Sequence, residues 1–256
     1  MTPEEETKKY RNELNKIVDS DRTIPGIFNY CDRWCERCTL SSRCTTYLME
    51  QFYEDEIAKP SDEENKKFWD QISFNFTVVR DMLEEAMDKF DITEEDLEDI
   101  EIEPLNKKEK SKAEKLSFDY AMKMSNWLEN NSDYFNSKSN SYSIINDEIN
   151  IELSDAIEIV QFYEFFIAPK IARANSEKLF RTDDKDFIQS DNNGSAKIAL
   201  IAINRSIEAL GILTKYFPEK EDELLDFLVT LSRIKKLVDN DFPNAMEFIR
   251  PGFDEI

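Results

Sequence analysis

Apolar residues recur at helical spacing along most of the chain, and no segment has a convincing strand pattern. The clearest case is 61–90, where an apolar stripe about six turns long predicts a helix that faces the core. The stripe consists of Phe68, Ile72, Phe76, Val79, Leu83, Ala86 and Phe90. Further helices are predicted over roughly 3–19, 44–58, 92–100 and 106–130.

The second half of the chain is more apolar than the first. A helix is predicted over 153–175, and Pro169 should kink it because a proline inside a helix lacks an N–H and clashes with the preceding turn. The segment 195–217 is apolar nearly all round, as expected of a helix buried at the centre of a bundle. An amphipathic helix over 221–238 follows it.

These patterns predict an all-α protein with seven to eight helices in an irregular bundle and an N-terminal four-cysteine segment. With 4 glycines and 8 prolines, the chain has few residues for the tight turns of β-hairpins. The Asn- and Ser-rich stretch 130–142 is the best predicted loop. It separates an N-terminal helical part, 1–130, from a C-terminal bundle, 143–256, unless both belong to one continuous domain.

The charge balance and the apolar runs limit the environments in which the chain can function. It has 55 acidic and 33 basic residues, a formal net charge of −22. Such a surface repels phosphate backbones and anionic membranes, so nucleic acid is not expected as a partner. No run of about 18 apolar residues predicts a membrane segment, and the start "MTPEEETKKY" does not resemble a secretory signal. We therefore expect a cytoplasmic protein, in which structural disulfides are uncommon.

All four cysteines lie within fourteen residues of a chain that has no histidine. They are Cys31, Cys35, Cys38 and Cys44. Four soft donors in one short segment can meet around one centre, and thiolates select zinc or iron–sulfur clusters. The four can complete the tetrahedron of a zinc ion or hold the corners of a 4Fe–4S cluster. The segment is therefore the candidate metal site.

The spacing C-x3-C-x2-C-x5-C leaves several interpretations open. In a continuous helix Cys31 and Cys38 would lie roughly 10 Å apart along the axis. That separation is too large for one zinc ion, whereas a cluster, whose irons are spread out, can bridge a longer distance. Zinc tolerates loop geometry, however, and is favoured, with a 4Fe–4S cluster as the alternative and reduced or redox-paired thiols as the third interpretation. The first three cysteines share the spacing of radical SAM enzymes, but the chain lacks the strand–helix alternation of their β/α barrel.

Two lone charges, Glu164 and Arg205, lie on otherwise apolar helical faces. An unpaired buried charge costs several kcal/mol, so we expect both to be mostly buried and paired with each other or with another charge. One interpretation is a buried ion pair that fixes helix register. The other is a ligand pocket in which Arg205 holds an anion. The remaining pocket residues would be Glu164, Tyr163 and Lys170.

No motif names a substrate, a reaction or a partner. Without histidine, Ser-His-Asp triads and the Glu-x-x-His pairs of di-iron bundles are excluded. Gly194 could present backbone N–H groups to an anion, although an N-cap at Ser195 is the simpler interpretation. We expect an interaction or adaptor protein with a structural zinc site and a protein partner. The alternatives are an iron–sulfur redox or sensor protein and an enzyme whose pocket around Arg205 and Glu164 takes a small-molecule ligand.

Overall fold

The regular elements of the structure are helices. The computed structural model describes residues 12, 15–17, 20–57, 76–77, 79–90, 109–135, 147–176 and 188–254. No strand occurs within these ranges, so the predicted all-α class is confirmed. The contacts between Cα atoms divide the chain into two compact units. Unit 1 comprises Met1–Phe28 and Arg33–Lys108, and unit 2 comprises Asn29–Asp32 and Glu109–Ile256.

Unit 1 contains the cysteine turns and helix α2, Thr45–Ile57, which agrees with the helix predicted over 44–58. The predicted helix over 3–19 is described only at Asn12 and 15–17, which are helical. The one over 92–100 lies outside the described residues. Residues 76–77 and 79–90 are helical, as predicted, and the earlier part of that helix also lies outside the described residues.

The apolar stripe of this helix is exposed in its described part. The exposed fraction is 71% for Phe76, 58% for Leu83 and 69% for Phe90. The helical period was therefore predicted correctly, whereas the prediction that the stripe faces the core was wrong. Periodicity identifies an apolar face of a helix, but it contains no information on what covers that face.

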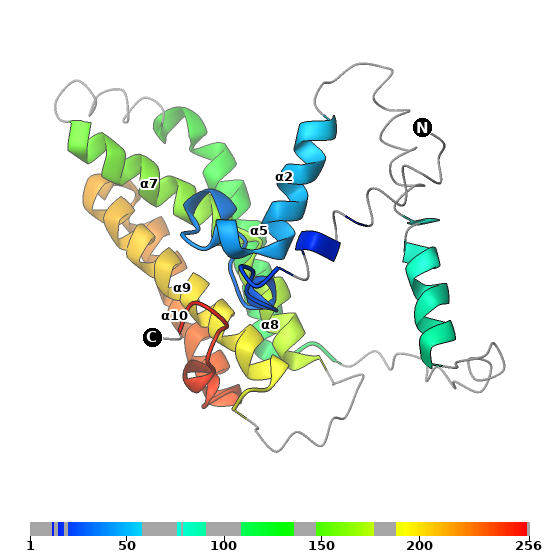
Figure 1. Ribbon diagram of the computed structural model, residues 1–256. Helices are drawn as coiled ribbons and strands as arrows, with labels where there is room; N and C mark the ends of the chain where they lie inside the picture. Colours follow the sequence, from blue (N-terminus) through cyan, green and yellow to red (C-terminus); the bar gives the residue numbers. More distant parts are fainter. Residues whose placement is uncertain are drawn as a thin grey trace. The chain divides into compact units, whose positions relative to one another are not determined.

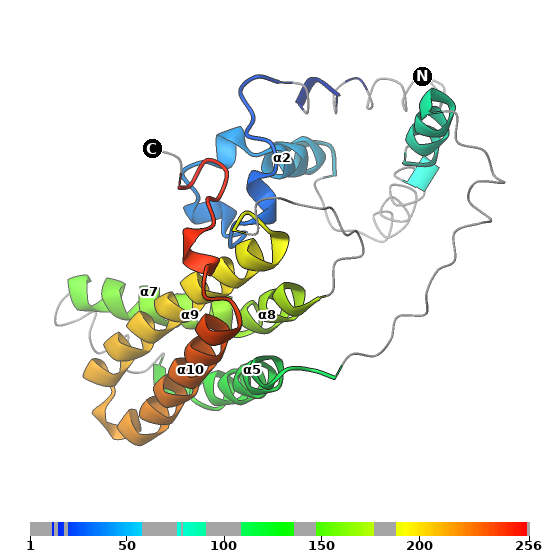
Figure 2. The ribbon, with the colours of Figure 1, turned by 90° about the horizontal axis from the view of Figure 1, so that it is seen from below.

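Unit 2 is a bundle arranged around one central helix. Its helices are α5 (Lys112–Asn130), α7 (Asp147–Glu164), α8 (Ile167–Asn175), α9 (Asp191–Tyr216) and α10 (Glu221–Asp241). Helix α9 contacts α7, α8 and α10, and α5 packs against α10, α8 and α7 (Figures 1 and 2). The central position of α9 is the one that its apolar sequence predicted, because side chains on most of its faces are buried.

Local sequence signals account for several helix boundaries in unit 2. The Ser111 hydroxyl accepts a hydrogen bond from the Glu114 N–H at 3.1 Å, and the Glu114 carboxylate accepts one from the Ser111 N–H at 2.6 Å, which is a capping box at the start of α5. The chain between α7 and α8 breaks at 165–166. Pro169 cannot donate the helical bond to the carbonyl of Phe165, so the predicted kink is present.

The division of the chain differs from the one expected at 130–142. Helix α5, which was assigned to the N-terminal part, belongs to unit 2 because its apolar face is buried among the helices it packs against. Residues 132–135 of the expected loop are helical, and 136–142 lie outside the described residues. None of the described helices is both long and apolar enough to cross a bilayer.

Candidate metal centre

The cysteine segment, residues 31–44, is built from short turns. Two 3-10 turns, Cys35–Arg37 and Ser41–Arg43, are each followed by a cysteine with extended backbone. The N–H of Cys38 donates to the carbonyl of Cys35 at 3.2 Å, and the N–H of Cys44 donates to the carbonyl of Ser41 at 3.0 Å. The segment is therefore not a continuous helix, and the separation along a helix axis that counted against a zinc ion does not apply to it.

Arg33 lies between the first two cysteines and has a φ of +61°. It is the one residue other than glycine with a positive φ in the described part of the chain. An arginine in the left-handed region costs about 1 kcal/mol or more, and such residues persist where the surroundings fix the backbone. Arg33 turns the chain between Cys31 and Cys35 and so breaks any helical path that would join them.

The four thiols differ in burial, and no disulfide joins them. Cys44 is buried, whereas Cys31, Cys35 and Cys38 are partly exposed, unlike most structural cysteines of a core. Within the described residues, no three side chains of histidine, cysteine, aspartate or glutamate lie close enough together to hold a metal ion. The backbone thus confines the sulfurs to one segment, but their side chains do not converge on a point.

Two arginines of the segment each have a contact with an uncharged group. The guanidinium of Arg37 lies 4.0 Å from the centre of the Trp34 ring, and Trp34 is buried. The Nε of Arg43 donates to the carbonyl of Arg22 at 3.2 Å. Neither contact neutralises the positive charge of the arginine. The charge of Arg43 can therefore offset part of the negative charge that four thiolates give to a metal centre.

Tyr30, immediately before the first cysteine, is fixed on the bundle of unit 2. Its hydroxyl donates to Asp191 at 3.0 Å, and its ring lies 4.6 Å from the ring of Phe248. A Cβ on Gly194 would lie 2.4 Å from the Tyr30 ring, so the glycine is required for this close approach. Burial and the negative charge of Asp191 raise the pKa of Tyr30 to about 12. The hydroxyl therefore remains a neutral donor at physiological pH.

Gly194 was predicted to precede the central helix, but it lies inside it. Helix α9 begins at Asp191, and its N-cap is Ser190, whose hydroxyl accepts from the N–H of Asn193 at 3.3 Å. Ser195, the predicted cap, is buried within the helix. The glycine serves the packing of the Tyr30 ring, which the sequence around residue 194 does not indicate.

Asp32, immediately after the first cysteine, is the second anchor. Its carboxylate accepts a hydrogen bond from the Tyr163 hydroxyl at 2.7 Å and forms an ion pair with Arg205. Arg205 also donates to the Tyr163 hydroxyl at 2.5 Å. Burial and the hydrogen bond to Asp32 raise the pKa of Tyr163. Cys31 therefore lies between two residues that unit 2 holds in place.

Arg205 is paired with another charge, as expected, but this charge is not Glu164, and the expectation that the Arg205 side chain is mostly buried was wrong. The carboxylate partner of Arg205 is Asp32, and the Arg205 side chain is 49% exposed, because its position on α9 faces the boundary of the bundle and not its centre. The partly buried Glu164 ends α7, and its Oε2 atom is buried without a hydrogen-bond partner. Burial raises its pKa, which a hydrogen bond from Ser125 partly opposes. The Lys170 ammonium lies 5.1 Å from the centre of the Phe166 ring.

Of the four residues predicted to share a pocket or ion pair, Tyr163 and Arg205 contact each other. Tyr163 and Arg205 meet at Asp32, whereas Glu164 and Lys170 have other neighbours. Sequence reasoning missed Tyr30 and Asp32 as anchors. Their partners are 131 to 173 residues away in the chain, and no local pattern reports a contact over that separation.

The chain matches no protein-family model, no curated protein and no solved structure. Its function is therefore inferred from its residues and their contacts. The four thiols are the groups whose chemistry suggests a function, because thiolates are strong ligands for zinc and for iron–sulfur clusters.

Proposed function

We propose that Cys31, Cys35, Cys38 and Cys44 bind one metal centre, with zinc as the favoured metal, in a non-enzymatic helical protein that interacts with another protein. The observation that carries the proposal is the confinement of all four thiols to fourteen residues of short turns in a chain without histidine. Four thiolates satisfy the tetrahedral preference of zinc, with Zn–S distances near 2.3 Å.

The small core around the cysteines supports a structural role for the metal. Among the described side chains of 20–51, the buried ones are Thr23, Ile27, Trp34 and Cys44. Regions with so little apolar burial are commonly held by a metal or by disulfides, and no disulfide is present. Because the sulfurs do not converge, the proposal requires that the metal draws them together through side-chain rotation and small shifts of the turns.

The iron–sulfur alternative gives the protein a redox or sensor role. It is supported by the partial exposure of three of the cysteines and by the uneven spacing, since the irons of a cube are spread out and accept ligands over a longer reach. Arg33, Arg37 and Arg43 would offset the negative charge of either centre.

The proposed interaction role is supported by the exposed apolar stripe at Phe76, Val79, Leu83 and Phe90. Exposed apolar patches on proteins commonly mark sites that bind other proteins. The net charge of −22 opposes nucleic acid as the partner and favours a partner with a basic surface. The enzyme alternative has less support, because Arg205 and Glu164 do not meet at one site.

The test is the metal content and visible spectrum of the full chain purified without oxygen. Zinc in a 1:1 ratio without visible colour supports the zinc site, whereas iron, sulfide and a brown colour support the cluster. Cys38→Ser should lower the bound metal, and Ser42→Ala, an exposed control in the same segment, should not. Equal metal binding by both variants, or none by the wild type after reconstitution with zinc or with iron and sulfide, would reject the proposal.

A further inference from the structure

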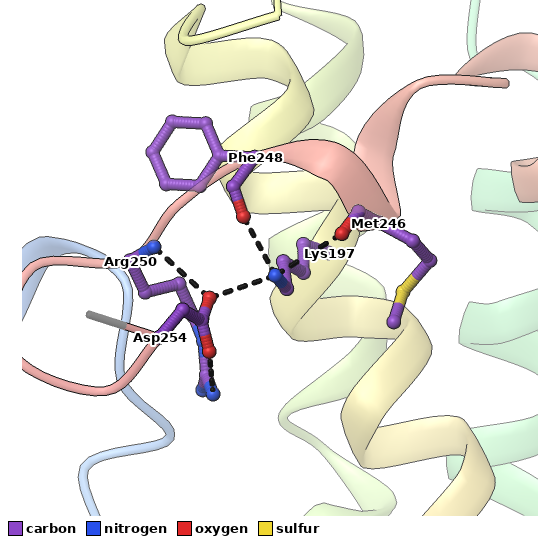
Figure 3. A network of polar contacts seen from close by, with 5 residues as sticks. All are labelled: Lys197, Met246, Phe248, Arg250 and Asp254. Carbon is purple, nitrogen blue, oxygen red and sulfur yellow. Dashed lines mark hydrogen bonds and ion pairs between the residues drawn. The ribbon is translucent and has the colours of Figure 1, made fainter. Parts of the chain in front are cut away.

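Lys197 is a buried cation in the central helix of the bundle. Its side chain is 9% exposed, and its ammonium donates three hydrogen bonds to the segment near the end of the chain (Figure 3). The acceptors are the carbonyls of Met246 at 3.2 Å and Phe248 at 2.6 Å, and the Asp254 carboxylate at 2.7 Å. All three ammonium protons are therefore used, which is the condition for burying a lysine without a large penalty.

Asp254 fixes this segment, residues 245–254, here called the strap. Its carboxylate also accepts from the N–H of Arg250 at 3.0 Å and from the Arg250 guanidinium at 2.8 Å (Figure 3). Burial opposes the charged form of Asp254, but the bonds from Arg250 and Lys197 outweigh burial and hold its pKa well below the usual range. Lys197 and Asp254 thus fasten the strap to α9.

The strap contacts the residue that precedes the first cysteine. Phe248, whose carbonyl binds Lys197, places its ring 4.6 Å from the Tyr30 ring, centre to centre. A Cβ on Gly194 would lie 2.8 Å from the Phe248 ring and 2.4 Å from the Tyr30 ring. The Tyr30 ring therefore occupies the space that a side chain at residue 194 would need. It also packs against the Phe248 ring of the strap.

We infer that the strap positions the first thiolate of the metal site and couples metal affinity to the packing of unit 2. The inference rests on the proposed function of the cysteines. Lys197 and Asp254 act as positioning residues: they hold Phe248, Phe248 holds Tyr30, and Tyr30 holds the backbone at Cys31. A ligand that is already in place loses less conformational entropy when the metal binds. By thermodynamic reciprocity, bound metal should in turn stabilise the strap.

The test uses the full chain and Zn²⁺, whose affinity is measured by competition with a chromophoric chelator. Asp254→Asn keeps the shape of the side chain but removes the charge that binds Lys197. It should lower zinc affinity by about 10-fold, within the usual range of coupling between sites. The control is Lys215→Met, which removes the pair with Glu152 at the opposite end of the same helix and should leave zinc affinity unchanged.

A second readout separates positioning from metal binding. In metal-free protein, the alkylation rate of Cys31 relative to Cys38, measured by mass spectrometry of peptides, should rise several-fold in Asp254→Asn. Gly194→Ala provides an independent variant, because alanine favours the helix but its Cβ displaces Tyr30. It should change both readouts in the same direction even if Asp254→Asn does not fold.

The outcomes distinguish the inference from the proposed function. Weaker zinc binding together with faster Cys31 alkylation supports both. If the wild type binds no zinc and Cys31 alkylation still rises, the metal site is rejected and the positioning of Cys31 by the strap is supported. If folded variants keep wild-type zinc affinity, the strap does not act on the metal site and the inference is overturned, whatever the alkylation rate.

Discussion

The bundle of unit 2 and the cysteine region of unit 1, here residues 33–51, are ordered by different interactions. Helix α9 buries more than half of its residues. Among them are Leu200, Ile203 and Leu210, each 1% exposed or less. The described side chains of 33–51 bury only Trp34 and Cys44. The bundle thus has the core that stabilises a domain without a cross-link, whereas the cysteine region has turns and thiols in place of a core.

This difference indicates that truncation inside α9 should mainly destabilise the bundle, whereas loss of metal should act on the cysteine region and the strap. Burial of apolar area scales with the number of packed side chains, so truncation within α9 removes a large share of the stability of unit 2. A metal site instead contributes stability to the ligands it joins, to the backbone between them and, by the inferred coupling, to the strap, but not to the apolar core around α9.

The largest expected effect is in the bundle. Ile203→Ala should lower the free energy of unfolding by about 2–5 kcal/mol, because it leaves a cavity in a fully buried site. Chemical denaturation followed by far-UV circular dichroism measures the change. The control is Glu208→Ala, an exposed position on the same helix, which should stay within about 0.5 kcal/mol of the wild type. A loss below about 1 kcal/mol for Ile203→Ala would show that α9 is not the core.

The second effect is confined to the cysteine region. Removal of metal, or Cys44→Ser, should cost roughly 2–3 kcal/mol of local stability, the value for a ligand present at about 100 times its Kd. Hydrogen exchange should show lost protection at 33–51, with α9 and α10 unchanged. Ser42→Ala serves as the control. Equal loss of protection in α9 would contradict the separation of the two regions.

The third prediction concerns pH and the strap. The lowered pKa of Asp254 means that its contribution, about 1 kcal/mol for a partly exposed ion pair, is complete above the ordinary carboxyl pKa near 4. It is lost as the pH falls further towards the lowered pKa of the folded state. The stability difference between wild type and Asp254→Asn should therefore be constant from about pH 7 to 5 and shrink below about pH 4. A difference that grows on acidification would be inconsistent with the charged carboxylate that binds Lys197.

The smallest effect is expected at the exposed stripe. Phe90→Ser should change the free energy of unfolding by less than about 0.5 kcal/mol, because the side chain is 69% exposed. Thermal or chemical denaturation of the full chain is sufficient to measure this. A loss above about 1 kcal/mol would mean that the stripe is covered in the isolated protein and does not serve as a partner surface.

Much of the helical architecture could be predicted from local patterns. The central position of α9 followed from apolar residues on nearly all its faces, and the break before α8 followed from Pro169. Both signals act within one or two turns of the chain. The exposed stripe at Phe76 and Phe90 shows the limit of this reasoning, since the same periodicity occurs on a covered and on an uncovered helix.

The clustering of the four thiols could be predicted from the sequence, but the contacts that support them could not. The clustering of cysteines is visible in the sequence because ligand spacing is local. The anchors at Tyr30 and Asp32 depend on Asp191 and Arg205, which are 161 and 173 residues away. Arg205 was expected at the centre of an apolar face. Its long side chain instead reaches solvent and pairs with the Asp32 carboxylate.

The most direct measurement of the central claim is a zinc titration of the reduced, metal-free chain combined with counting of reactive thiols. The account predicts that one equivalent of zinc per chain protects all four thiols, and that Cys31→Ser leaves a weaker site in which fewer thiols are protected. Circular dichroism of the bundle should not change during the titration. Four thiols that remain fully reactive in excess zinc, and equally in the iron- and sulfide-reconstituted protein, would contradict a shared metal centre.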